Sequence, residues 1–228
     1  MLLYETPSWL SAGSTGSGEE LDETRACGHG QPLSLPRQTH SDHVAAVSAC
    51  GRPEDTDAVF TNVPGLCLAV KTADCIPVLL YDNSQHSIAA IHAGWRGTVQ
   101  RIVEKTILAM GSNGVNLSAI IGPGIGVESF EVGDEVYEHF LQEGFPMELI
   151  AQRYPRDLRN QKGLLNFEEG KWHIDLWEAN AWLLRQCGVH DIHVAGVDTF
   201  ISPHYYSARR DGIGTGRNYN WIEMNVER

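Results

Sequence analysis

The chain has 228 residues, of which 42% are hydrophobic and 20% are charged, so it is long enough to bury a substantial core. Its 17 basic and 29 acidic residues give a formal net charge of −12. This balance predicts that neither nucleic acid nor an anionic membrane surface is a partner, because both attract clustered lysine and arginine.

The cysteines and the apolar runs indicate the expected cellular location of the protein. No stretch approaches the roughly 18 consecutive apolar residues of a membrane span. The opening residues MLLYETPSWL lack the basic start and long apolar run of a secretory signal. The five cysteines are odd in number, scattered and free of any CxxC pair. This pattern favours reduced thiols, so we expect a cytoplasmic protein.

The first part of the chain divides into an irregular segment and a run of strands. Residues 1–36 carry loop-forming residues and little periodicity, so we predict loops there and assign the segment to the same domain as 37–228. Apolar runs predict strands at 66–70, 76–82 and 87–93. The turn between the last two predicts that they form an antiparallel hairpin.

The rest of the chain alternates helices and strands. Apolar residues at helical spacing predict a helix that Thr98 caps and that Gly111 or Gly114 ends. Further elements are predicted in this order: a strand at 117–126 that runs into a glycine-rich corner, helices at 132–144 and 174–189 (the second ended by Gly188), a buried strand at 191–199 and a short final strand. The mixed strand order favours an α+β fold over a doubly wound parallel sheet.

His40, Cys75 and His92 are the first candidate functional group, because each lies at the end of a predicted strand beside polar and glycine residues. Two imidazoles and one thiolate suit Zn²⁺ and leave a fourth position for water or substrate. Asp74 or Gln38 is expected to support the site or handle protons. The residues alone leave an alternative, in which Cys75 is a small buried hydrophobe and both histidines are surface residues.

The segment SARRDGIGTGR is the second candidate. Arg209, Arg210 and Arg217 lie among glycines and fit a phosphate clamp. A solvated basic loop that pairs with the protein's own carboxylates fits equally well. The glycines of IGPGIG, at 121–126, follow neither GxGxxG nor GK[ST], so we predict a tight corner there instead of a nucleotide-binding loop.

Five segments taken in order resemble the laccase-domain family: QTHSDHV, LAVKTADCIPVLLYD, IAAIHAGWRGTVQRIVEKTI, IGPGIGVESFEVGDEV and YYSARRDGIGTGR. This family is also called the multicopper polyphenol oxidase family and is now viewed as a purine nucleoside phosphorylase family. The resemblance covers about 37–228, and TADC followed by HAGWRG is its most specific part. It implies a single α+β domain with mixed β-sheets in a layered α-β-β-α arrangement. The segment before Gln38 is shorter than in the family.

The resemblance also implies a metal and an activity. One Zn²⁺ is expected on His40, Cys75 and His92, with phosphorolysis of adenosine, inosine and methylthioadenosine and a side activity as an adenosine deaminase. The small-molecule substrates are therefore a purine nucleoside and phosphate. The expected site residues are the catalytic group Cys75, Asp74, Arg96 and Arg210 and the substrate-binding group Gln38, Arg209, Arg210 and Arg217.

Two other functions remain open at this point. Two histidines and one cysteine also bind Cu²⁺, so a laccase-like polyphenol oxidase is the second prediction. Reduction of dioxygen to water needs several coppers, however, and the sequence has no HxH or HCH motif to hold them. The third possibility is a non-enzymatic zinc module, in which a fourth ligand such as His43 closes the metal site.

Overall fold

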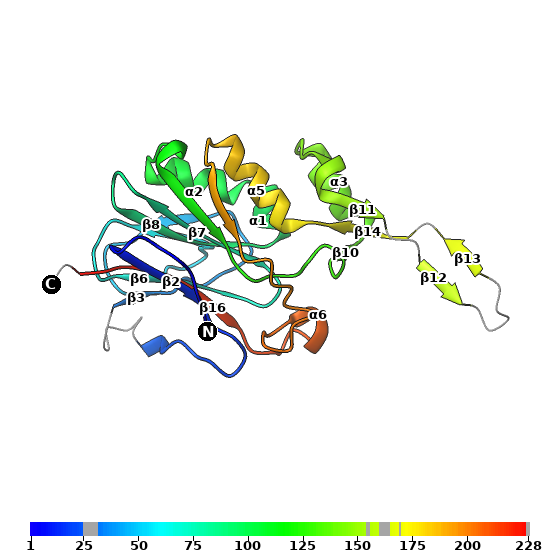
Figure 1. Cartoon of the computed structure of the whole chain (residues 1–228), viewed down its shortest axis with the longest axis horizontal. Helices are drawn as coiled ribbons and strands as arrows, with labels where there is room; N and C mark the ends of the chain where they lie inside the picture. The colour runs from blue at the N-terminus through cyan, green and yellow to red at the C-terminus, as the bar shows by residue number, and fades with distance from the viewer. Residues whose placement is uncertain (25–31, 154–155, 160–164, 169, 227–228) are drawn as a thin grey trace.

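The computed structural model has two stacked β-sheets with helices on one outer face, which confirms the predicted α+β fold with mixed sheets (Figure 1). The structure describes residues 1–24, 32–153, 156–159, 165–168 and 170–226. Cys27 lies outside these ranges. Among the described cysteines, Cys50, Cys75 and Cys187 have free thiols. In the described part of the chain, no helix is long and apolar enough to cross a membrane.

A six-stranded sheet forms the centre of the molecule, in the order β15-β9-β7-β8-β5-β4. β7 and β8 form the predicted antiparallel hairpin, with Val78 opposite Ile91, whereas β15–β9 and β4–β5 are parallel pairs. The bounds are β4 (Val44–Ala46), β5 (Ala58–Thr61), β7 (Ile76–Asp82), β8 (Ser87–Ala93), β9 (Leu117–Ile121) and β15 (Asp191–Val194).

Both faces of this sheet are covered, which explains the nearly continuous apolar runs of β7 and β8. Alternate side chains of a strand point to opposite faces. Val78 and Leu80 accordingly pack in the cluster that includes the helices. Leu79 and Tyr81 pack in the cluster between the two sheets.

The second sheet has five strands in the order β1-β2-β16-β6-β3, and its final strand β16 lies between β2 and β6. The bounds are β1 (Leu2–Leu3), β2 (Leu10–Ser14), β3 (Leu33–Ser34), β6 (Cys67–Thr72) and β16 (Asn218–Met224). On the outer face of this sheet, Leu33 and Leu35 pack against Leu21 and Trp221.

The prediction of loops throughout 1–36 was wrong, because β1, β2 and β3 belong to this sheet. β2 pairs with β16 over five residues, and its small residues suit close packing. A Cβ on Gly13 would lie 2.8 Å from the Leu2 carbonyl oxygen. Ser14 is fully buried and its hydroxyl donates to the Asn220 side chain at 2.6 Å.

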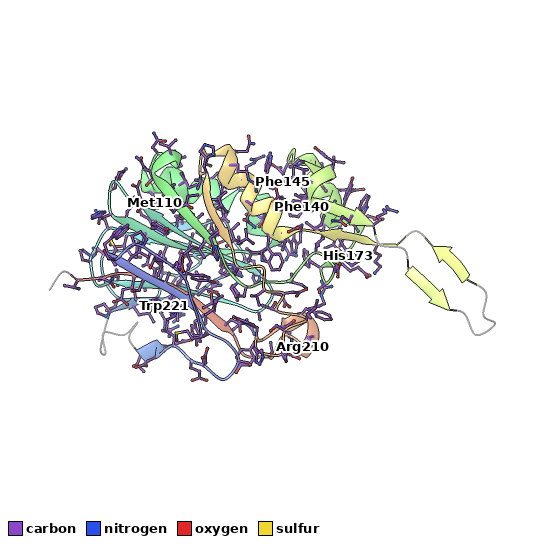
Figure 2. All side chains as sticks on the ribbon, viewed as in Figure 1. Met110, Phe140, Phe145, His173, Arg210 and Trp221 are labelled. Atoms are coloured by element: carbon purple, nitrogen blue, oxygen red, sulfur yellow. The ribbon has the colours of Figure 1, made fainter. Side chains whose placement is uncertain are left out.

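Helices α1, α2 and α5 cover the outer face of the six-stranded sheet (Figure 1). Phe140 and Phe145, labelled in Figure 2, contribute to the same core and meet edge to face at 4.9 Å. The helices are α1 (Trp95–Val99), α2 (Ile102–Met110), α3 (Asp134–Gln142), α4 (Met147–Ile150), α5 (Leu176–Gln186) and α6 (Ala208–Asp211), with a short 3₁₀ turn at Gly114–Asn116.

The helix that was predicted to begin at Thr98 is two helices, and Thr98 does not cap either. It is fully buried inside α1, where its hydroxyl accepts a hydrogen bond from the Asn180 side chain at 3.1 Å. Arg101 has a left-handed backbone, with φ of 62°, and separates α1 from α2. The predicted end at Gly111 is confirmed, since its φ of 66° closes α2.

The prediction of a buried strand at 191–199 was wrong in its length and in its burial. The strand forms only as β15, which lies at the edge of the six-stranded sheet and pairs on one side with β9. Val194 is 41% exposed there. The predicted end of the preceding helix is confirmed, because Gly188 follows α5 with a φ of 80°.

Two small sheets complete the fold. One has the order β10-β14-β11 and consists of Glu131–Val132, Trp172–Ile174 and Ala151–Arg153. The other is a hairpin of β12 (Arg156–Arg159) and β13 (Leu165–Glu168), which projects away from the rest of the molecule (Figure 1).

Candidate metal centre and its cavity

The register of three strands brings the candidate metal centre together at one end of the six-stranded sheet. Cys75 immediately precedes β7, and Asp57 immediately precedes β5. His92 is the second-last residue of β8 and lies opposite Pro77. Its backbone N–H donates to the Asp57 carbonyl oxygen at 2.8 Å. Residues far apart in the chain therefore meet where the three strands begin or end.

His40, Cys75 and His92 lie together, with their ligand atoms all within 4.8 Å of one another. The two imidazole rings are 4.9 Å apart, centre to centre, at an angle of 78°. His92 is 3% exposed, Cys75 is half-buried and His40 is exposed. Two imidazole nitrogens and one thiolate fit a divalent metal such as zinc, and the exposed side of His40 leaves access from the solvent.

Asp57 holds both histidines of the centre, and the sequence analysis missed it. Its Oδ1 lies 2.7 Å from Nδ1 of His92 and accepts a hydrogen bond from the His40 backbone N–H at 3.1 Å. Its Oδ2 accepts from the backbone N–H groups of Thr39 and Ser41 at 3.0 and 2.8 Å. These bonds hold His40 in a left-handed backbone conformation, with φ of 62°.

The charges of Cys75, His92 and Asp57 depend on one another. Burial opposes ionisation of Cys75, but His92 and then His40 outweigh this effect and lower the pKa of the thiol to about 6. Burial likewise opposes protonation of His92, but the Cys75 thiolate and Asp57 raise its pKa to about 9. Asp57 is buried, which disfavours its charge, yet the hydrogen bond from His92 and those from residues 39 and 41 hold its pKa well below the usual range. Without metal, these shifts favour a Cys75 thiolate beside a protonated His92. The thiolate is the form that binds metal, whereas His92 would have to release its proton to a metal ion.

Gly94 leaves room for the centre, which leads to a prediction. A Cβ on this residue would lie 3.1 Å from Sγ of Cys75 and 3.3 Å from Cδ2 of His40. We expect Gly94→Ala to fold normally, because its φ of −68° suits alanine, but to weaken zinc binding about tenfold by displacing two ligands. Gly51→Ala is the control, since its Cβ would meet nothing within 4 Å. Competition with a chelator measures both affinities, and equal values would contradict the prediction.

The centre opens into a cavity of about 440 Å³. Its lining residues are Pro36, Arg37, Gln38, His40, Arg52, Lys71, Ala73, Cys75, His92, Ala208, Ile213 and Arg217. Four of these carry a permanent positive charge and none is acidic, although the chain as a whole has a net charge of −12. The cavity is therefore suited to an anionic ligand.

Two of the basic residues that line the cavity, Arg52 and Lys71, form ion pairs with Glu23. Its carboxylate accepts from Nζ of Lys71 at 3.1 Å and from Nη2 of Arg52 at 2.5 Å. It also accepts from the Tyr219 hydroxyl at 2.6 Å. Partial burial disfavours the charge on Glu23, but Tyr219, Arg52 and Lys71 together lower its pKa to about 2. Glu23 thus remains charged and keeps both cations at the cavity wall.

Arg210 does not line the cavity, although it was predicted to hold phosphate. Its guanidinium donates to four backbone carbonyl oxygens and to the Asp211 carboxylate. The carbonyl groups belong to Thr199, Phe200, Ser202 and Tyr205. Arg210 belongs to α6 and is labelled in Figure 2. Because its N–H donors already have acceptors, the side chain stabilises the loop that precedes α6, and the clamp has no support from this geometry.

Arg209 and Arg96 also lie outside the cavity lining. The Arg209 guanidinium donates to the Glu131 carbonyl oxygen at 3.2 Å and covers the ring of Phe130 at 5.6 Å. Arg96 is exposed and stacks on Trp95, with its guanidinium carbon 4.4 Å from the ring centre. Of Arg209, Arg210 and Arg217, only Arg217 lines the cavity.

Gln38 and Asp74 both support the centre through hydrogen bonds. The Gln38 amide pairs with the backbone of Lys71 in both directions, at 2.8 Å each. Asp74 has a left-handed backbone, with φ of 88°. Its carboxylate accepts from the Thr199 hydroxyl at 2.8 Å and from the Arg209 backbone N–H at 2.6 Å. These bonds connect the segment that carries Cys75 to the tail of the chain.

His43, the suggested fourth ligand, is engaged elsewhere. Its Nδ1 lies 2.9 Å from the Asp55 carbonyl oxygen and 3.1 Å from the Asp55 carboxylate. These two contacts with Asp55 raise the pKa of His43. The predicted tight corner at 121–126 packs against the segment that carries Cys75, because a Cβ on Gly124 would lie 2.4 Å from the Ile76 side chain and 3.4 Å from the Cys75 carbonyl oxygen.

These features define a class of protein: an α+β chain with two stacked sheets and a candidate two-histidine, one-cysteine metal centre that opens into a basic cavity. The chain belongs to the family described as multi-copper polyphenol oxidoreductase laccase, which matches residues 19–225. The resemblance found in the sequence is thereby confirmed, and the match begins nearer the N-terminus than the motifs suggested.

Relatives and solved structures agree with this family. A purine nucleoside phosphorylase of Bacteroides thetaiotaomicron is 43% identical over 204 residues, which cover 82% of this chain and 71% of that protein. An adenosine deaminase from an unknown prokaryotic organism is 36% identical over 211 residues, covering 83% and 74%. The crystal structure of a Neisseria meningitidis protein superposes with a TM-score of 0.80 at 26% identity and covers 99% of both chains.

Proposed function

We propose that this protein is a zinc-dependent purine nucleoside phosphorylase that acts on adenosine, inosine and methylthioadenosine and also deaminates adenosine. The observation that carries the proposal is a candidate metal centre inside a cavity whose permanently charged lining residues are all basic. The relatives named purine nucleoside phosphorylase and adenosine deaminase support the same substrate class. The free thiols of Cys50, Cys75 and Cys187 support a cytoplasmic location.

Phosphorolysis requires a phosphate held in line with the bond between the ribose and the base, and this is mainly a positioning and electrostatic task. We assign that task to Arg52, Lys71 and Arg217, which line the cavity. Their charges also offset the negative charge that gathers around phosphate. This assignment replaces Arg96, Arg209 and Arg210, whose side chains do not line the cavity.

His40, Cys75 and His92 would hold the zinc. When bound, zinc supplies a Lewis acid that polarises a substrate oxygen or lowers the pKa of a water molecule. Asp57 accepts a hydrogen bond from Nδ1 of His92, so Nε2 of the same ring is left for the metal. The low pKa of Cys75 reduces the proton competition that a metal meets at that ligand, whereas the raised pKa of His92 means that binding would displace one proton from its ring.

The proposal is tested with zinc-loaded protein and adenosine, with and without phosphate. Phosphorolysis converts adenosine and phosphate to adenine and ribose 1-phosphate, so adenine should form only when phosphate is present. Deamination converts adenosine and water to inosine and ammonia, so inosine should form in both conditions. If neither adenine nor inosine forms, the proposed function is wrong.

Lys71→Met is expected to raise the KM for phosphate about tenfold, because it removes one charge from the cavity wall. The KM for adenosine should change less than twofold. Methionine keeps most of the apolar stem, and the backbone of residue 71 can still pair with Gln38. Lys171→Met is the control, because Lys171 also pairs with a glutamate, Glu131, and does not line the cavity. Equal phosphate KM values for the two variants would contradict the assignment.

The family description favours a second candidate function, copper-dependent oxidation of phenols. Two imidazoles and one thiolate also accept copper. Oxygen consumption by the copper-loaded protein with a phenol measures this activity. Oxidation faster than nucleoside cleavage by the zinc-loaded protein would put this candidate first.

A further inference from the structure

The most exposed large apolar side chain in the described part of the chain lies at the cavity that holds the candidate metal centre. Ile213 is 88% exposed and is one of the lining residues. Single exposed apolar residues are common on protein surfaces and need no explanation by themselves. Ile213 differs from the other exposed apolar residues because a ligand in the cavity would cover it.

The backbone around Ile213 is anchored while its side chain has no packing. The Arg217 guanidinium donates to the carbonyl oxygens of Ile213 and Thr215 at 3.1 and 2.6 Å. Gly212 precedes Ile213 with a φ of 88°, and Gly214 follows it. A Cβ added at either glycine would meet nothing within 4 Å, so the loop around Ile213 is open. Arg217 thus fixes the loop at the cavity and leaves the isoleucine free for a ligand.

The base of this loop is also connected to the metal centre. Ala208, at the start of α6, lines the same cavity. The backbone N–H of Arg209 donates to the Asp74 carboxylate at 2.6 Å, and Asp74 directly precedes the candidate ligand Cys75. One end of the loop is therefore tied to the segment of the metal centre, while Arg217 holds the loop itself in shape.

The cavity wall has basic residues and one exposed apolar residue, which would contact different parts of a ligand. Arg37, Arg52, Lys71 and Arg217 suit an anion, whereas Ile213 suits an apolar surface. A nucleoside offers such a surface in the flat face of its base. We propose that Ile213 is a specificity-determining residue that covers the purine base of the bound nucleoside. This inference rests on the proposed function. Burial of both apolar surfaces on binding would then favour substrates with a large base.

The test compares Ile213→Ala with the matched control Ile201→Ala, because Ile201 is 66% exposed but does not line the cavity. We expect Ile213→Ala to raise the KM for adenosine roughly three- to tenfold, with the KM for phosphate and kcat within twofold of wild type. Ile213→Leu should restore the wild-type KM, and Ile201→Ala should have no effect. An unchanged adenosine KM in Ile213→Ala would overturn the proposal, and so would an equal effect in both alanine variants.

Measuring the equilibrium binding of adenosine tests the role of Ile213 even if the proposed enzymatic activity is absent. If wild type neither cleaves nor deaminates adenosine, the proposed function fails, and calorimetry then decides the role of Ile213. Weaker adenosine binding by Ile213→Ala than by wild type and Ile201→Ala would support the contact. Equal binding by all three proteins, or no binding by wild type, would overturn it.

Discussion

Cys75→Ala is expected to reduce bound zinc from one ion per chain to less than a tenth and to abolish nucleoside turnover. Cys75 contributes the thiolate of the candidate centre, and its ligand atom lies within 4.8 Å of those of both histidines. Two imidazoles alone form a much weaker zinc site. The fold should remain, because the side chain is half-buried and small, and its truncation costs about 1 kcal/mol of unfolding free energy. Metal analysis after gel filtration and near-UV circular dichroism measure the two effects.

Cys50→Ala is the matched control, because Cys50 is another half-buried free thiol and does not line the cavity. It should keep wild-type zinc and turnover. A serine at position 75 separates size from ligand chemistry, since its hydroxyl does not ionise near neutral pH. Cys75→Ser should therefore behave as Cys75→Ala. Full zinc content in either Cys75 variant would show that the thiolate is not a ligand.

The sequence predicted the central elements well because their apolar pattern depends on local burial. β7 and β8 are buried on both faces, and their short polar turn fixes an antiparallel hairpin, so a run of apolar residues was enough to predict them. β2 was missed because LSAGS has small polar residues whose burial depends on its distant partner β16. The break between α1 and α2 was also missed, since Arg101 is not a residue that marks a left-handed turn.

The site was predicted in part, and the predictions that failed have a common cause. The metal trio could be proposed because Cys75 and His92 lie at the ends of predicted strands, and the family resemblance singled out both of them together with His40. The arginines could not be ranked, because a sequence does not reveal which guanidinium groups line the cavity. Arg210 bonds to nearby carbonyl groups, whereas Lys71 and Arg52 reach the cavity from separate segments. Only tertiary structure separates these cases.

Asp57 was missed because its contacts with His92 and residues 39–41 also form only in the tertiary structure. The second large prediction concerns this residue. Asp57→Asn is expected to weaken zinc binding between about tenfold and a hundredfold, because a carboxylate that orients a ligand histidine contributes this much to metal affinity. The carboxylate accepts from His92 and from three consecutive backbone N–H groups. An amide can accept through its oxygen but places N–H donors where acceptors are needed. Chelator competition measures the affinity.

The same change should lower the free energy of unfolding of the metal-free protein by about 2–4 kcal/mol, because it breaks a fully buried charged pair with His92. Asp42→Asn is the control. Asp42 lies in the same segment and pairs with Lys105, but its side chain is 24% exposed and contacts neither histidine. Urea unfolding compares the two variants. If Asp57→Asn lost stability but kept full zinc affinity, Asp57 would hold the segment of residues 39–41 without orienting the ligands, and the metal centre would depend on strand register alone.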